Sequence, residues 1–535
     1  MINNEIWRKH ERCEDYILRK NLVANTNKHW NFYLGKQWEG LESGGEELPA
    51  MNFVKPIVKH KVSTVCQNNA AVVYSDAMGN EELAEVHKTL SQIFSACWEK
   101  AEMDANVWNI VKNGAIAGDS YAFFGTADVR DMQILSNTSV LLADEQNPNI
   151  QEQPYVIIRE RLPVSDVKEI ARQNGIPEDE IETIKPDEDT DHLIHNRDDV
   201  EHKGDDGKTT SLLYMEKIDG VVHFAKCVKT CVYQPMTPIR SELGGQAARG
   251  MTLYPIVNFV WEDAPNSARG KGEVAELIPN QIEVNKSLAR ISMSVKTSAF
   301  PRLAYARESV LNPDDLDKVG AAIEVTGNNA QSVNQMISYL SPMAMSSDAR
   351  VFVNDLMTNT RELSGASDTA LGNIDDPTRV AASAVIAIND QSTRSMNEQV
   401  AKVKKLTEDF ARLWPEIWFT YNPAGMTVTR EIDGATVPLT IAKEDMERLA
   451  PDIRVDVSQD NPWSKNAEQQ AADSLLDKQL ISFEEYVELI PDSGPVPKSK
   501  LKKILEARAA AERLAQERAP STEGGEPNEM PDVRQ

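Results

Sequence analysis

The sequence predicts an α+β protein that is predominantly helical, and three observations lead to this prediction. Apolar residues recur at three- and four-residue steps over residues 273–298, as in a long helix with a narrow apolar stripe. Two further helical patterns cover residues 345–363 and 377–420. Short runs rich in β-branched and aromatic residues, separated by turns, predict strands between residues 121 and 232.

The N-terminal part predicts helices first and strands later. Helices are expected over residues 1–30, 54–69 and 81–117, with a glycine-rich turn region between the first two. A short helix at residues 163–175 has Ser165 as its candidate cap. The strand candidates are residues 121–125, 133–135, 155–162, 211–218 and 221–232.

Residues 177–207 are strongly acidic and include Asp187-Glu-Asp-Thr-Asp191 and three histidines. A metal-dependent nuclease needs clustered carboxylates to hold two divalent ions. This run is rich in turns and poor in apolar residues, and it lacks the glycine and the terminal glutamate of a calcium loop. We interpret it as a solvated surface loop, with adventitious cation binding and catalysis as alternatives.

The cysteines suggest no disulfide framework or zinc site. They are five, scattered along the chain, which suits a reducing compartment. On one strand, Cys227 and Cys231 would lie about 13 Å apart on the same face, too far to share a metal without a turn. Gly270-Lys-Gly272 lacks the Walker A pattern, and no Gly-x-Ser-x-Gly elbow occurs. We therefore predict no catalytic residue, cofactor or metal.

The helix at residues 273–298 would be about 36 Å long at about 1.5 Å per residue. Its apolar positions are Val274, Leu277, Val284, Leu288, Ile291 and Val295, and Gln281 fills the one gap. We predict that Val284, Leu288, Ile291 and Val295 pack against neighbouring helices. The basic side chains of this helix are Lys286, Arg290 and Lys296.

Residues 299–342 form a compact insertion between two long helices, so they must protrude from the far end of those helices. Strands are expected near residues 300–306 and 320–325, with a capped turn at Asn312. The candidate contacts for a partner are Arg302, Arg307, Lys318 and Gln331, although a plain solvated surface is the alternative for each.

The loop from Ser364 to Asp375 contains two glycines and small polar side chains, so we expect it to be mobile. Asp376 and Pro377 suit the cap and first turn of the next helix, whose polar middle predicts a kink. A hairpin is expected within residues 426–457 and helices within 466–519, and the composition of residues 520–535 predicts disorder.

In their order and spacing, several segments resemble the portal proteins of tailed double-stranded DNA bacteriophages. The resemblance covers roughly residues 5–510. It rests on Trp30-Asn-Phe-Tyr-Leu-Gly-Lys-Gln-Trp38, Asn52-Phe-Val-Lys-Pro-Ile-Val-Lys59, Gly114-Ala-Ile-Ala-Gly-Asp-Ser-Tyr121, Pro255-Ile-Val-Asn-Phe259, and the segments 270–285 and 364–388.

The resemblance implies a portal fold with named parts. An α+β wing would cover residues 1–262, the stem helices 263–298 and 343–363, and a small α/β clip 299–342. A tunnel loop would cover 364–376, a long kinked wing helix with returning strands 377–465, and a helical crown 466–519, followed by the tail at 520–535. The tunnel-loop residues expected to face DNA are Ser364, Gly365, Ser367, Asp368, Thr369, Gly372 and Asn373.

The resemblance also implies a ring of about twelve subunits at one vertex of the capsid. Double-stranded DNA would enter and leave through it without sequence-specific contacts. The implied partners are the terminase large subunit, neck or tail proteins, and the major capsid and scaffolding proteins, with the protein in the virion and earlier in the host cytoplasm. No apolar run approaches a membrane span, so no membrane partner is expected.

The net charge of −26 is unusual for a protein that handles DNA, because DNA-binding proteins are normally basic. A channel has a different requirement, since several rings of lysines would hold the duplex by releasing its counterions and resist its passage. Isolated basic rings in a neutral or acidic bore avoid this, and Lys286, Arg290 and Lys296 are candidates for one. Simple solubility explains the charge equally well. The functional alternative is a cytoplasmic, metal-dependent nucleic-acid-processing enzyme that uses the acidic loop and Cys227 with Cys231.

Overall fold

The computed structural model describes residues 2–39, 48–67, 69–76, 84–187, 207–243, 246–299, 303–305, 310–316, 318, 322–326, 337–339, 348–366, 395–432, 435–442, 453–460, 476, 478, 482 and 486. Helices and antiparallel sheets make up this part, and helix exceeds strand, which confirms the predicted α+β class. The chain divides into two compact units, residues 1–67 with 72–457, and residues 68–71 with 458–535.

The first unit begins with five helices: α1 (Ile2–Arg19), α2 (Leu22–Leu34), α3 (Val54–Val65), α4 (Ala84–Lys100) and α5 (Met103–Ala117). Two of the predicted helices were too long, because residues 1–30 and 81–117 are each interrupted. The breaks lie at Asn21 and Glu102, whose φ angles are 50° and 49°. A left-handed residue cannot continue a right-handed helix, so each forces the chain into a new direction.

The largest sheet is antiparallel and has the order β4 (Val140–Leu142), β5 (Tyr155–Pro163), β6 (Lys208–Ile218), β7 (Val221–Cys227) and β8 (Val232–Pro238). Helix α1 covers one face, where Ile6, Cys13 and Ile17 pack on Ile157 and Tyr214. The opposite face, with Ile158 and Met215, joins the main core. Burial of alternate residues on both faces explains the apolar character of these strands.

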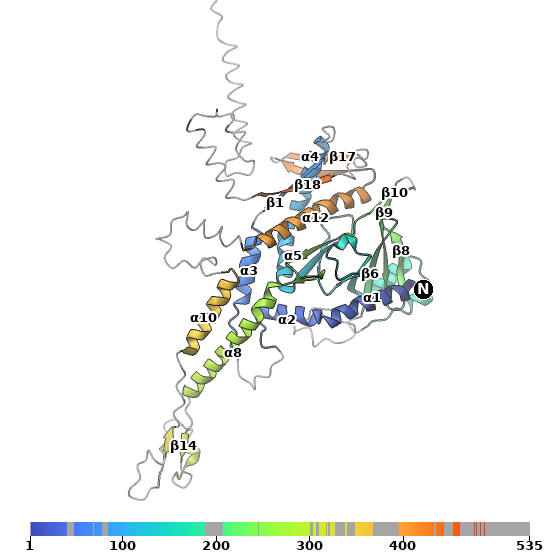
Figure 1. Ribbon diagram of the computed structural model, residues 1–535. Coiled ribbons are helices and arrows are strands. Elements are labelled where there is room, and N and C mark those ends of the chain that lie inside the picture. Colours follow the sequence, from blue (N-terminus) through green and yellow to red (C-terminus); the bar gives the residue numbers. More distant parts are fainter. Residues whose placement is uncertain are drawn as a thin grey trace, which may run out of the picture. The chain divides into compact units, whose positions relative to one another are not determined.

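A second sheet has the order β11 (Ile256–Val260), β2 (Asp119–Phe124) and β3 (Met132–Ser136), and lies in the main core with α5 and α12 (Asn397–Tyr421) (Figure 1). On α12, Phe410 and Trp414 pack in an aromatic cluster with Phe94 and Trp98. The smaller pairs are β9 (Arg240–Leu243) with β10 (Gln246–Gly250), β12 (Glu262–Asp263) with β13 (Gly270–Lys271), and β16 (Gly425–Ile432) with β17 (Ala435–Ala442).

Two local predictions in this region were wrong. Residues 221–232 are a hairpin rather than one strand, because the chain turns at Val228, whose N–H donates to the carbonyl of Cys231. Helix α6 (Val164–Gln173) has Pro163 in the cap position, so Ser165 lies inside its first turn and does not cap it. The short helix α7 (Glu178–Ile181) follows, and Ile181 and Ile184 are buried. These two are the only buried side chains in the segment 177–187, whose other residues lie at the surface, so the predicted solvated segment contains a short helix here. Residues 188–206 lie outside the described residues.

Helices α8 (Glu273–Ala299) and α10 (Asp348–Leu363) lie side by side (Figure 1). At 27 residues, α8 is about 40 Å long. Between them, β14 (Leu303–Tyr305) pairs with β15 (Ile337–Tyr339) in antiparallel register, and Val310 forms a bridge with Val325. The remaining short helices are 3-10 turns, η2 (Ile150–Glu152) and η4 (Pro313–Asp315).

One boundary between the two units falls within strand β1 (Asn69–Asp76), and another falls within strand β18 (Ile453–Asp460). In the second unit, the N–H of Tyr486 donates to the carbonyl of Ser482, as in a helical turn. Apart from a few isolated positions, the predicted crown at 466–519 and the tail at 520–535 lie outside the described residues, as does the predicted helix start at 377–394.

Candidate functional site

The candidate site is the stem, which we define as α8 and α10. The amide of Asn280 donates to the hydroxyl of Thr360 over 3.0 Å, and Val284 and Val353 are buried in the same cluster. Asn280 lies near the start of α8 and Thr360 near the end of α10, so the two helices run antiparallel. The stem therefore leads away from the core along α8 and returns along α10.

Two buried amides attach α8 to the N-terminal part of the chain. Gln281 accepts a hydrogen bond from the N–H of Phe53 (3.1 Å) and donates to the carbonyl of Met51 (2.8 Å). Asn285 lies one turn later and donates to Gln37. The polar Gln281 interrupts the apolar stripe because its side chain forms hydrogen bonds with the N–H of Phe53 and the carbonyl of Met51. Without it, these backbone groups would be buried without hydrogen-bond partners.

Burial decreases steadily along the predicted packing stripe of α8. Val284 is fully buried, Leu288 and Ile291 are half-buried against the core, and Val295 is 52% exposed. Met293 is 56% exposed, and on α10 Val351 and Phe352 are 55% and 51% exposed. The stripe therefore packs within the chain at its first half and leaves an apolar surface uncovered at its second half.

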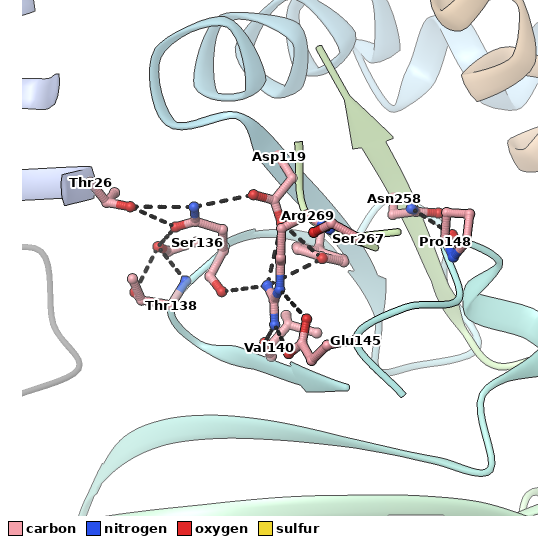
Figure 2. A network of polar contacts seen from close by, with 12 residues as sticks. Thr26, Asp119, Ser136, Thr138, Val140, Glu145, Pro148, Asn258, Ser267 and Arg269 are labelled. Atoms are coloured by element: carbon pink, nitrogen blue, oxygen red, sulfur yellow. Dashed lines mark hydrogen bonds and ion pairs between the residues drawn. The ribbon is translucent and has the colours of Figure 1, made fainter. Parts of the chain in front are cut away.

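The loop before α8 is fixed by a buried arginine, Arg269, which the sequence did not single out (Figure 2). Its Nε and Nη2 each donate to Glu145 over 2.9 Å, and Nη1 lies 3.3 Å from Asp119. Nη1 and Nη2 also donate to the carbonyls of Asn137 and Val140. These bonds occupy most of the guanidinium donors and attach the loop to β2, to the turn after β3 and to the segment after β4.

The same network reaches α2 through a chain of side chains. Asn137 donates to Asp119 over 3.2 Å and also to the hydroxyl of Thr26 (Figure 2). Burial raises the pKa of Asp119, while Arg269 and the hydrogen bonds from Tyr121 and Asn137 counteract the rise. The stem thus starts from a junction that joins the second sheet to α2.

Glycines allow the backbones to meet at this junction. Gly118 has a φ of 113°, and a Cβ there would lie 2.4 Å from the carbonyl oxygen of Gly270. A Cβ on Gly272 would lie 2.6 Å from the carbonyl oxygen of Ile116. Gly270 and Gly272 therefore permit close packing of the loop on α5 and β2.

The three basic residues predicted for the stem are all exposed. Arg290 lies 3.6 Å from Glu283 on the same helix. Lys286 makes no ion pair within the part of the chain that the structure describes. It is therefore the best candidate among the three for an unneutralised charge.

The first residues of the predicted tunnel loop form the end of α10. Gly365 has a φ of 76°, and its N–H donates to the carbonyl of Glu362, while the N–H of Ala366 donates to that of Arg361. This pair of bonds is the Schellman arrangement that closes a helix at glycine. The hydroxyl of Ser364 donates to the carbonyl of Arg361, so neither Ser364 nor Gly365 belongs to a mobile loop. The other predicted loop residues, Ser367, Asp368, Thr369, Gly372 and Asn373, lie outside the described residues.

Of the predicted contacts in the insertion, only Lys318 is described, and Arg302, Arg307 and Gln331 are not. Lys318 forms an ion pair with Asp315 over 2.6 Å at the end of η4. A turn does begin at Asn312, whose carbonyl accepts from the N–H of Asp315, but the Asn312 side chain does not cap it as predicted. That side chain instead accepts from the N–H of Glu324 and donates to the carbonyl of Ala322.

The residues of the enzyme alternative do not converge in the described structure. Asp187 accepts hydrogen bonds from Arg161, Thr209 and the backbone of Thr210, which leaves little room for a cation. Cys227 and Cys231 flank the turn between β7 and β8 and pack in different clusters, and burial raises the pKa of Cys227 to about 12. A turn does join them, contrary to the single strand predicted, but their thiols are parts of two separate cores.

Within the described residues, no group of three or more histidine, cysteine, aspartate or glutamate side chains is arranged to hold a metal ion. In the same part of the chain, no helix combines the length and apolar character needed to cross a membrane. No protein-family model and no curated protein matches this chain.

Proposed function

We propose that the protein is a phage portal protein, a ring-forming channel for double-stranded DNA. The observation that carries the proposal is the exposed apolar surface on the second half of the stem, formed by Met293, Val295, Val351 and Phe352. Several exposed, large apolar side chains near one end of a helix pair favour an interaction site there. A second copy of the same stem, repeated around a closed ring, would cover it.

The insertion between α8 and α10 supports the same proposal. Its strands β14 and β15 pair with each other across residues 303–339, so the insertion holds its own structure at the point where the stem reverses. In a portal ring this is the clip, which would contact the terminase large subunit during packaging and neck or tail proteins afterwards. The specific portal fold, with wing, stem, clip and crown, is part of the proposal, as are the capsid and scaffolding partners and the location in the virion.

Charge fits a channel that lets DNA slide. The chain carries −26 overall, and on the stem Lys286 is exposed and forms no ion pair with any described residue. Twelve such lysines at one level would attract the duplex weakly and leave it mobile. We expect Lys286→Glu to change packaging or genome retention in a salt-dependent way while the ring stays intact. Arg290→Glu is expected to act less, because Arg290 already lies beside Glu283.

The decisive experiment is native mass spectrometry of the purified full-length protein, combined with electron microscopy. We expect closed rings of about twelve copies with a central opening. Compact monomers that cleave nucleic acid in the presence of Mg²⁺ would contradict the proposal and favour the enzyme alternative.

A further inference from the structure

A partly open cavity of about 380 Å³ lies away from the stem, between the five-stranded sheet, the segment at the end of β2 and the end of α12. Its apolar lining includes Leu213, Met215 and Phe224 from one face of the sheet, and Phe123 and Ile417 opposite them. A cavity of this size, lined by apolar side chains together with several polar ones, is typical of small-molecule sites.

The polar side chains that line this cavity include Glu160 on β5, Lys226 on β7, Gln234 on β8 and Gln133 on β3. Within the described structure, none of these side chains forms a hydrogen bond or a close ion pair with another residue. Burial raises the pKa of Glu160, and Lys226 counteracts this rise. An acid, a base and two amides thus border the cavity without a hydrogen-bond partner among the described residues, so they are available to a ligand.

The strand register sets the separation of the two charges. Glu160 pairs with Ser211 and Lys226 with Leu213, so the two residues lie on either side of β6 and two positions apart along it. With strands about 4.8 Å apart and a rise of about 3.4 Å per residue, their Cα atoms are about 12 Å apart. Both side chains start from the same face of the sheet, and both line the cavity.

We propose that this cavity binds a short apolar peptide with free termini, with its ammonium group at Glu160 and its carboxylate at Lys226. An extended dipeptide spans about 7 Å. A hydrogen bond of about 3 Å at each end extends this reach to about 13 Å, close to the separation of the Cα atoms of Glu160 and Lys226.

The other lining residues fit the same ligand. The side-chain amides of Gln133 and Gln234 can both donate and accept, which matches the N–H and carbonyl of a peptide bond. The ligand's apolar side chains would contact Met215 and Phe224. A single amino acid is too short to reach both charges, so the geometry distinguishes a dipeptide from its components. This inference does not depend on the proposed ring.

The test uses the dipeptide Leu-Leu as the probe and isothermal titration calorimetry on the full-length protein. Leu-Leu is expected to bind, whereas leucine and a Leu-Leu derivative blocked as the N-acetyl amide are expected to bind at least about tenfold more weakly. Glu160→Gln and Lys226→Gln should each weaken Leu-Leu binding by about ten- to a hundredfold, because each removes a charged hydrogen-bond partner.

The matched controls are Glu182→Gln and Lys229→Gln, which make the same changes at exposed positions outside the cavity. They should leave Leu-Leu binding unchanged. Circular dichroism checks that the near-isosteric cavity variants fold. Gln234→Met removes a hydrogen-bonding amide but no charge, and it should also weaken Leu-Leu binding. The highest peptide concentration is 10 mM, which is on the order of a hundredfold above the dissociation constant expected for such a site. Absence of Leu-Leu binding at this concentration would overturn the proposal. Equal binding of the blocked derivative, or equal binding by the cavity and control variants, would overturn it as well.

Discussion

Arg269 contacts two buried carboxylates, so its loss is expected to affect the stability of the fold. Its side chain is 6% exposed, and those of Asp119 and Glu145 are 1% and 8% exposed. Ions in such a place have lost most of their hydration, and each depends on its partners for compensation. Removing the arginine alone would leave two acidic groups buried beside each other.

We predict that Arg269→Met lowers the free energy of unfolding by about 3–5 kcal/mol. The control is Arg172→Met, which removes an exposed ion pair with Glu178 and should leave stability almost unchanged. Urea denaturation of both variants gives the comparison. If Arg269→Met is no less stable than Arg172→Met, the network does not hold the loop before α8.

The sequence did not reveal Arg269 because its partners are distant along the chain. Asp119 lies 150 residues away and Glu145 lies 124 residues away, so no local pattern links them. Val274 and Val284, by contrast, were predicted as buried from spacing alone, and both are fully buried. The close approach of Gly118 and Gly270 also joins distant segments and left no signal beyond two unexplained glycines.

At the scale of elements, helices and strands could be predicted well where one face is apolar. Strands β5 and β6 and helix α8 lie within a few residues of their predicted positions. The breaks at Asn21 and Glu102 were missed, since neither is a glycine or proline and the apolar pattern continues across them. The end of α10 could be placed at Leu363, but the role of Gly365 as a cap required its backbone geometry.

The cap at Gly365 leads to a prediction for α10. Gly365→Ala should lower the free energy of unfolding by about 1 kcal/mol, because a Cβ is unfavourable at a φ of 76°. Gly365→Asn should lose less, since asparagine tolerates the left-handed region better. Thermal unfolding of the two variants measures the difference. Equal stability of wild type and Gly365→Ala would show that the cap contributes nothing.

Proline at this position would disrupt the cap itself, because its ring fixes φ near −65°. A stiffened tunnel loop therefore has to be tested at Gly372, beyond the cap, with Gly365 left unchanged. Packaging efficiency and genome retention of particles carrying Gly372→Pro would measure the loop separately from the end of α10. Wild-type packaging by that variant would contradict a DNA-facing role for the loop.

For the whole molecule, the sequence could not separate packing within one chain from packing between chains. Val284 and Val295 occupy the same stripe of α8 and looked equivalent in sequence. One is fully buried within the chain and the other is 52% exposed. Apolar surfaces that meet a partner follow the same helical period as surfaces that meet the core, so only the fold distinguishes them.

This difference gives a prediction that separates folding from ring assembly. Val284→Asp buries an unpaired charge in the core and should lower the free energy of unfolding of the single chain by about 3 kcal/mol or more. Val295→Asp should leave that free energy almost unchanged, yet remove the ring, because the charge would be buried at every contact between subunits. Leu288→Asp should lie between them, since Leu288 is half-buried.

Ser292→Asp, at an exposed polar position of the same helix, is the control. Urea denaturation under monomeric conditions measures the first effect and native mass spectrometry the second. Rings of Val295→Asp at wild-type yield would show that the uncovered half of α8 is not the surface between subunits.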